Sequence, residues 1–165
     1  MLTTYDIIGR RVIVGLFKQD RKADTASVGL VGHTAVLNAL IRAGLEVLVP
    51  WGDHYRYDLA IIDPESPPGS AVLLRVQCKT ARLSRDRGYL LFSTFSVTIR
   101  VGGKAHAKKG YQGQLEYFAV YSPDIEKVYL VPVGDITYAG EARLRLKPPR
   151  NGQEQGVRWA KDYEL

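Results

Sequence analysis

Apolar side chains recur at helical spacing between residues 27 and 43. Most of them fall three or four positions apart, and residues at that spacing lie on one side of an α-helix. Gly44 comes next, and glycine is common just after a helix because it adopts the left-handed conformation at little cost. The pattern predicts an amphipathic helix over residues 27–43. The apolar residues of its face are Leu30, Val36, Leu37, Leu40 and Ile41.

Six short apolar runs follow the predicted helix, each with the length of a β-strand. The sequences PESPPGS and PDIE separate neighbouring runs and predict turns, because proline interrupts regular structure. One run, AVLLRVQCK, is almost continuously apolar, which is typical of a strand in the centre of a sheet. In chain order the runs are LEVLVP, YDLAIID, AVLLRVQCK, YLLFSTF, LEYFAVYS and KVYLVPV.

A helix followed by these strands predicts a single α/β domain over residues 1–165, with one mixed β-sheet flanked by helices. Residues 1–26 form an N-terminal extension whose structure the pattern leaves open. The segment TIRVGGKAHAKKG is rich in glycine and basic residues, so we expect a mobile loop there. From Ile136 onward the chain is expected to wrap around the periphery of the domain.

Composition narrows the class of protein. A chain of 165 residues with 45% hydrophobic and 24% charged residues can bury a core, which argues against disorder. No apolar run approaches the length of a membrane span, and no secretion signal opens the chain, so we expect a cytoplasmic protein. The single cysteine, Cys78, fits a reducing compartment, and without a Cys/His cluster we expect no structural zinc site.

Positive charge is concentrated in one part of the chain. Residues 75–109 hold nine Lys and Arg against one acid, Asp86, so this segment carries +8 while the whole chain carries +6. Charge of one sign gathered in this way indicates a polyanion partner, most simply nucleic acid. The alternative is a basic surface that only faces solvent.

Three residues around two of the predicted strands suggest a chemical site. Asp58 begins one strand, while Gln77 and Lys79 lie near the end of the next and, by the two-residue period, point to the same face. A carboxylate, an amide oxygen and an ammonium can together hold a hard cation and act on a phosphate. Asp58, Gln77 and the backbone carbonyl of Cys78 are candidate Mg²⁺ ligands. Lys79 could polarise water or stabilise the phosphate, and the Cys78 side chain is expected in the core.

The segments GDHYRYDLAIID and LLRVQCKTARL resemble the PD-(D/E)XK nuclease superfamily. They are most similar to endonucleases associated with group I introns, which have glutamine before x-Lys. Similarity extends over residues 28–165 through HTAVLNALIRAGLEVLVP, YQGQLEYFAVYSPDIEKVYLVPV and LKPPRNGQEQGVRWAKDYEL. The resemblance implies a restriction-endonuclease-like core of α-β-β-β-α-β type and hydrolysis of double-stranded DNA with Mg²⁺, or with Mn²⁺ in its place. It also implies a homo-oligomer, a dimer or a tetramer.

The sequence departs from this family at one position. The family usually has a glutamate in the first helix, where this chain has His33 or, in the neighbouring register, Thr34. Asp58 is then the only carboxylate expected at the site, which predicts weak binding of free Mg²⁺. Three interpretations stay open: His33 positions water or the phosphate, the DNA phosphate supplies the missing charge, or the protein binds DNA without cleaving it.

Residues for DNA contact follow from the charge pattern. Basic side chains in the loop after the strand of Gln77 and Lys79, and in the glycine-rich segment after the next strand, would meet phosphates, which give affinity without sequence choice. Arg56 could clamp a phosphate or pair with Asp53. Base reading is expected from residues 89–100, laid in the major groove as a two-stranded ribbon, unless its alternation only separates core from solvent. The basic candidates are Arg56, Arg82, Arg85, Arg87, Arg100, Lys104, Lys108 and Lys109, with His106 beside them.

The leading hypothesis is therefore a Mg²⁺-dependent DNA endonuclease, site-specific in the manner of homing enzymes, with Asp58, Gln77, Lys79 and His33 at its catalytic site. A junction-resolving nuclease with the same fold and metal chemistry is a second interpretation. A DNA-binding protein with a degraded nuclease site is the third, and the missing helix glutamate is the feature that supports it.

Overall fold

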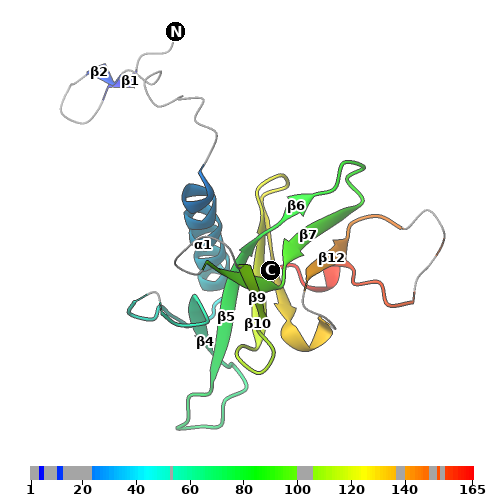
Figure 1. Ribbon diagram of the computed structural model, residues 1–165. Helices are drawn as coiled ribbons and strands as arrows, with labels where there is room; N and C mark the ends of the chain where they lie inside the picture. Colours follow the sequence, from blue (N-terminus) through cyan, green and yellow to red (C-terminus); the bar gives the residue numbers. More distant parts are fainter. Residues whose placement is uncertain are drawn as a thin grey trace.

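The computed structural model describes residues 4–5, 11–12, 24–52, 54–99, 106–136, 140–148, 152 and 155–165 of the chain (Figure 1). Two short strands, β1 (Thr4–Tyr5) and β2 (Arg11–Val12), pair in the N-terminal segment. The one α-helix of the described residues comes next and leads into the sheet that carries the candidate site. Among these residues no helix is both long and apolar enough to cross a membrane.

Helix α1 (Thr25–Arg42) confirms the helix predicted from apolar spacing. It begins at Asp24, whose carboxylate accepts a hydrogen bond of 2.7 Å from the backbone N–H of Ser27 and so satisfies one of the free donors of the first turn. After the helix, Gly44 adopts a φ of +82°, as expected of a residue that ends a helix. The buried side of α1 consists of Gly32, Val36 and Leu40.

The main sheet has five strands in the order β11-β10-β5-β4-β3. Only β5 and β10 pair in parallel; the other neighbours are antiparallel, so the sheet is mixed as predicted. Strand β5 lies at the centre, in agreement with its continuous apolar run. The strands are β3 (Val47–Leu48), β4 (Leu59–Ile62), β5 (Leu73–Thr80), β10 (Tyr117–Ser122) and β11 (Lys127–Pro132).

Two further sheets correct the sequence-based expectations. The tail predicted to be only a wrap contains β12 (Glu141–Arg145), which pairs with β7 (Tyr89–Ser93), and β7 pairs with β6 (Arg82–Leu83). The segment predicted to be a mobile loop contains β9 (His106–Gly110), which pairs with β8 (Phe95–Ile99) as a two-stranded ribbon. The resemblance also implies a second core helix, but the described residues between β5 and β10 form these strands and turns. Short 3-10 helices, η1 (Val133–Asp135) and η2 (Ala160–Asp162), complete the described fold.

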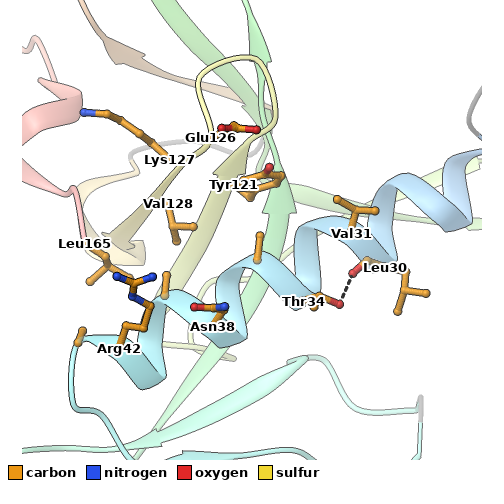
Figure 2. Close-up of a pocket in the computed structure, with 13 residues that line it drawn as sticks. Leu30, Val31, Thr34, Asn38, Arg42, Tyr121, Glu126, Lys127, Val128 and Leu165 are labelled. Carbon is orange, nitrogen blue, oxygen red and sulfur yellow. Dashed lines mark hydrogen bonds between the residues drawn. The ribbon is translucent and has the colours of Figure 1, made fainter. Parts of the chain in front are cut away.

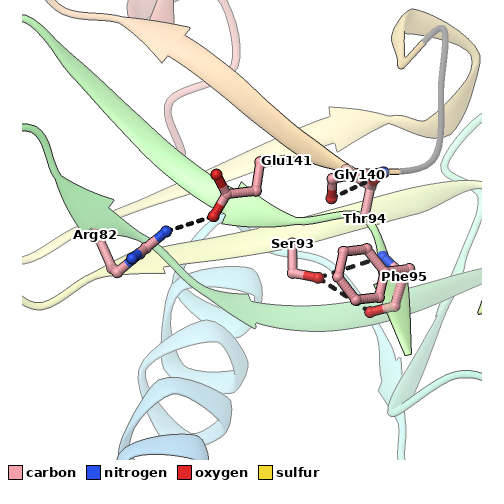
Figure 3. A network of polar contacts seen from close by, with 6 residues as sticks. All are labelled: Arg82, Ser93, Thr94, Phe95, Gly140 and Glu141. Atoms are coloured by element: carbon pink, nitrogen blue, oxygen red, sulfur yellow. Dashed lines mark hydrogen bonds and ion pairs between the residues drawn. The ribbon is translucent and has the colours of Figure 1, made fainter. Parts of the chain in front are cut away.

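Thr94 marks the point where the β8–β9 ribbon leaves the second sheet, which consists of β6, β7 and β12. Its side chain is buried, and its hydroxyl donates to the carbonyl of Gly140 over 3.0 Å and accepts from the Gly140 N–H over 2.8 Å. The backbone N–H of Thr94 donates to the same carbonyl (Figure 3). This contact fixes the end of β7 against the start of β12, so the following ribbon departs from a well-held position.

The main sheet is covered on both faces. One core lies between the sheet and α1 and includes Val36, Leu40, Leu59, Val76 and Ala119. The other core lies between the main sheet and the second sheet. It includes Leu90, Phe92, Phe118, Val120 and Leu144, all nearly inaccessible to solvent. Burial on both faces explains why the sequence of β5 shows little polar alternation.

Candidate active site

The site forms where strand β4 stops pairing with β5. The last pair in the register is Leu59 with Val76, and the N–H of Asp58 still donates to the carbonyl of Val76 over 2.9 Å. Beyond this point the Asp58 carboxylate takes the place of the missing strand. One oxygen, Oδ2, accepts hydrogen bonds from the backbone N–H of Cys78, at 2.7 Å, and from the side-chain amide of Gln77. Asp58 therefore lies just before β4 and not within it, and it closes the open edge of β5.

Gln77 and Lys79 point to the same side of β5, as the two-residue period predicts. In the parallel register they lie opposite Phe118 and Val120, which belong to the core between the two sheets. Cys78 points to the other side and packs against the core beneath α1. Burial raises the pKa of the Cys78 thiol, so this side chain remains a neutral packing residue at ordinary pH.

Lys79 has a partner that the sequence did not indicate. Its ammonium donates a hydrogen bond of 3.1 Å to the hydroxyl of Tyr111 and lies 4.8 Å from the centre of the same ring. Tyr111 is buried and packs edge-on against Phe118, with ring centres 5.6 Å apart. A tyrosine in a turn 32 residues away carries no sequence signal that would assign it to the site.

Arg56 also contacts Tyr111, with its guanidinium carbon 4.3 Å from the ring centre. All three of its nitrogens donate to acceptors of the protein. Nε binds the side chain of Gln114, Nη1 binds the hydroxyl of Ser96, and Nη2 binds the carbonyls of Gly110 and Lys109. In this structure the guanidinium therefore ties the β8–β9 ribbon to the segment between β3 and β4, just before Asp58.

His33 of α1 acts electrostatically on Asp58. Helix and strand approach closely here, because a Cβ added at Gly32 would lie only 2.6 Å from the hydroxyl of Thr80. Burial raises the pKa of Asp58. The Cys78 N–H opposes that rise most, followed by the charges of His33 and Lys79 and the hydrogen bond from Gln77. Thr34, the alternative in the neighbouring register, is exposed, and its hydroxyl bonds to the carbonyl of Leu30 at 2.9 Å.

The oxygen atoms at the site suit a hard cation, but their negative charge is small. The described residues contain no group of three or more His, Cys, Asp or Glu arranged to hold a metal ion. Asp58 is a partly buried carboxylate whose Oδ1 has no hydrogen bond to any residue described in the structure, and burial already disfavours its charge. A cation beside Oδ1 would offset that cost. The Gln77 amide oxygen and the Cys78 carbonyl are the neutral donors nearby.

The predicted DNA-contact residues fall into different surroundings. Arg82 forms an ion pair with Glu141 of β12 (Figure 3). Arg85 and Arg87 are exposed in the β6–β7 turn, and Arg87 adopts a positive φ of 54°. Lys109 is exposed on β9, where Lys108 contributes described backbone. Arg100, Lys104 and Asp53 lie outside the described residues.

The structure contains a two-stranded ribbon, but it pairs β8 with β9 and does not include the strand that begins at Tyr89. Base reading was expected from residues 89–100, but β7 pairs with β6 and β12, whereas β8 pairs with β9. The strand that begins at Tyr89 is therefore a component of the second sheet. Its alternation separates the buried Leu90 and Phe92 from more exposed neighbours.

The mixed sheet thus places a carboxylate and an amide in contact at the edge of its central strand, with the Lys79 ammonium on the same side of that strand as the amide. Residues 23–165 match the model of the PD-(D/E)XK endonuclease family. The chain therefore belongs to the PD-(D/E)XK endonuclease family, which confirms the resemblance seen in its motifs.

The fold is also similar to that of a solved protein, a bacterial homing endonuclease named I-Ssp6803I. The TM-score is 0.65, and the match covers 86% of this chain and 88% of that one at 24% sequence identity. Identity at this level shows a common fold, which confirms the predicted restriction-endonuclease-like α/β class. No curated protein sequence gives a match.

Proposed function

We propose that the protein is a Mg²⁺-dependent DNA endonuclease that hydrolyses phosphodiester bonds. The observation that supports this most directly is the contact of Asp58 with Gln77 at the edge of β5, with Lys79 on the same side of that strand and its charge acting on Asp58. Membership of an endonuclease family gives these residue types a common purpose. Mn²⁺ would serve in place of Mg²⁺, since both prefer oxygen ligands.

Asp58 Oδ1 and the Cys78 carbonyl would hold the metal ion, and the Gln77 amide would present its oxygen after rotating its terminal group. When bound, the ion supplies positive charge to the phosphate and lowers the pKa of a coordinated water. The two donors to Asp58 Oδ2 keep the carboxylate in one orientation. With a single carboxylate, the site would bind free Mg²⁺ weakly and gain affinity once a DNA phosphate is present.

Lys79 is proposed to stabilise negative charge that develops on the phosphate. Its ammonium needs a fixed position to do so, because electrostatic stabilisation depends on preorganised groups. Tyr111 provides that position through its hydroxyl and the face of its ring. His33 lies on the helix side of the site, where its imidazole could orient water or a phosphate oxygen.

The β8–β9 ribbon is proposed to read DNA, which would make cleavage site-specific. A two-stranded antiparallel ribbon fits the major groove, and Lys109 on β9 is exposed. The exposed Arg85 and Arg87 would contact phosphates from the β6–β7 turn, and Arg82 would do so if Glu141 releases it. In the structure Arg56 holds the ribbon, so we assign it to positioning and not to a phosphate clamp.

We further propose a homo-oligomer, in which two copies place two sites on one duplex. Helix α1 exposes 69% of Leu30 and 57% of Val31 beside a hollow of about 890 Å³ between the helix and the β10–β11 hairpin (Figure 2). Apolar exposure of this kind is costly in a monomer, so a second copy is the proposed occupant. Sedimentation of the protein and of the variant Leu30→Lys tests this, because a monomer in both cases contradicts it.

Incubation of plasmid DNA with Mg²⁺ tests the nuclease assignment. Asp58→Ala and Lys79→Ala should each lose nicking, while Arg143→Ala, which removes an exposed cation from β12, should keep it. Equal nicking by all of these proteins would remove the proposed site. Tight, salt-dependent DNA binding with no cleavage under any divalent ion would favour the degraded-site interpretation. Preference for four-way junctions over linear duplex would favour junction resolution.

A further inference from the structure

A second hollow, of about 470 Å³, borders the core between the main sheet and the second sheet. Strand β11, strand β12, the β6–β7 hairpin and the C-terminal segment enclose it, and Figure 1 shows β12 beside the red C-terminal turn. Backbone hydrogen bonds hold these segments together. The N–H of Lys147 donates to Gly88, and the N–H of Arg145 donates to Arg158. The lining has five cations: Arg87, Lys127, Arg145, Lys147 and Lys161.

The positive charge of this hollow is poorly compensated. Its lining includes one acid, Glu164, which already pairs with Lys127. Among the described residues no ion pair involves any of the other four cations. Arg145 lies over the ring of Tyr89, 5.0 Å from its centre, which fixes its direction. Cations gathered in a concave surface reinforce one another's potential and attract an anion.

One of the residues that line the same hollow, Tyr129, has a buried hydroxyl without a hydrogen-bond partner among the described residues. The whole Tyr129 residue is inaccessible to solvent. A buried hydroxyl without a partner destabilises the folded state, so such groups call for an explanation. An acceptor oxygen entering the hollow would provide the missing partner.

We propose that this hollow binds a phosphate group at a site separate from Asp58. A phosphate carries charge for the four cations that form no ion pair among the described residues and acceptor oxygens for the Tyr129 hydroxyl, and arginine suits it through its paired N–H groups. The phosphate could belong to the DNA backbone outside the cleavage site or to a free phosphorylated molecule. Both sources present the same chemistry to these side chains.

Trp159 lines the hollow and makes binding visible. The chain has two tryptophans, and the other, Trp51, is 96% exposed, so the variant Trp51→Phe leaves Trp159 as the sole source of tryptophan fluorescence. Titration of this variant with inorganic pyrophosphate should give a saturable change in emission. Adding Lys147→Gln should weaken binding about tenfold, the effect of losing one charge-assisted hydrogen bond. Adding Arg42→Gln, which neutralises a cation elsewhere, should leave it unchanged.

Tyr129→Phe separates a binding role from a structural one. Removing the unpartnered hydroxyl should weaken pyrophosphate binding several-fold, while the free energy of unfolding of the unliganded protein stays the same or rises. A variant that loses stability but keeps its pyrophosphate affinity would show that the hydroxyl contributes only to packing, and would overturn its role in the site.

Duplex binding distinguishes the two phosphate sources. If the DNA backbone occupies the hollow, Lys147→Gln should reduce the slope of log affinity against log salt by about 0.9, and Arg143→Gln, at an exposed cation that does not line the hollow, should not. If a free phosphorylated molecule occupies it, pyrophosphate should bind while the duplex slope stays unchanged. The proposal is overturned if pyrophosphate leaves Trp159 unaffected and the Lys147 variant binds duplex normally. If the wild-type protein cleaves no DNA but still binds pyrophosphate in this hollow, the nuclease assignment alone would be contradicted.

Discussion

The ammonium of Lys79 donates a hydrogen bond of 3.1 Å to the hydroxyl of Tyr111. The same ring lies under the guanidinium of Arg56, so one buried tyrosine contacts two cations from different parts of the chain. Tyr111 thereby connects the strand that carries Lys79 to the residue that holds the β8–β9 ribbon. Through this one residue, the proposed catalytic amine and the proposed DNA-reading ribbon share a support.

Tyr111→Phe should slow DNA cleavage about 10- to 100-fold, because a hydrogen bond to a charged group contributes about 1.5–3 kcal/mol. Phenylalanine keeps the packing against Phe118 and the ring face toward both cations, so the fold should be retained. Single-turnover cleavage rates at saturating protein measure the effect. If Tyr111→Phe cleaves at the wild-type rate, the hydroxyl does not position Lys79.

Asp58→Asn should abolish cleavage and raise the melting temperature of the metal-free protein by on the order of a few degrees. Burial raises the pKa of Asp58 above its usual 3.8, so the folded state favours the protonated form. The contribution of the Asp58 carboxyl group to stability is fully present below the pKa that this group has in the unfolded chain. It is lost as pH rises through the higher pKa of the same group in the folded state. The asparagine oxygen can still accept the Cys78 N–H.

The stability difference between Asp58→Asn and the wild type should therefore be small in acid and grow toward neutral pH. Chemical denaturation at several pH values measures it. Added Mg²⁺ should stabilise the wild type and not the variant, since a ligand stabilises only the state that binds it. A wild type that is more stable than the variant at neutral pH without metal would contradict this account.

His33→Glu should increase Mg²⁺ affinity, because it adds a second carboxylate where a charge already acts on Asp58. Thr34→Glu is the matched control, since that residue is exposed and its hydroxyl bonds back to Leu30. Calorimetric titration with Mg²⁺ should show at least about tenfold tighter binding for the first variant only. Equal affinity for both variants would place residue 33 away from the metal.

Arg56→Lys should loosen the β8–β9 ribbon. Lysine keeps the charge but cannot reach Gln114, Ser96 and Gly110 together, because its donors radiate from a single nitrogen. Amide hydrogen exchange in β8 and β9 should accelerate about tenfold or more, as the ribbon opens locally. Arg85→Lys, in the exposed β6–β7 turn, serves as the control. Unchanged exchange in the ribbon would show that other contacts hold it.

Two glycines of α1 should respond oppositely to alanine. At Gly29 a Cβ would meet nothing within 4 Å, so Gly29→Ala should stabilise the protein by about 0.5–1 kcal/mol through helix propensity. At Gly32 the Cβ would lie 2.6 Å from the hydroxyl of Thr80, so Gly32→Ala should destabilise by about 1–3 kcal/mol. Urea unfolding compares them. Equal effects would mean that α1 does not approach β5 so closely.

The charge pattern of the sequence changes meaning in the folded chain. Residues 75–109 are strongly basic in sequence, yet Arg75 forms an ion pair of 2.7 Å with Glu116, and Arg82 pairs with Glu141. Meanwhile Lys147 and Lys161, from a tail with little net charge, join Arg87 around one hollow. The net charge of a sequence segment therefore does not give the charge of the surface that it forms, because ion-pair partners and neighbouring cations come from distant segments.

Sequence alone determined the parts of this protein that depend on neighbouring residues. The spacing of apolar residues specified α1. The continuous apolar run of β5 predicted that this strand lies at the centre of the sheet. The two-residue period set Gln77 and Lys79 on one side of the strand, since backbone geometry fixes these directions locally. The position of Asp58 close to the start of a strand could also be predicted, because the motif that contains it is a local stretch of sequence.

Tertiary structure decided what joins these parts. The support of Lys79 by Tyr111, the fastening of the ribbon by Arg56, and the pairing of β12 with β7 each involve residues more than 30 positions apart. Such contacts follow from how sheets and helix pack, and packing leaves no periodic signal in the sequence. The cationic hollow beside Tyr129 arises in the same way, from four separate segments that meet only in the folded chain.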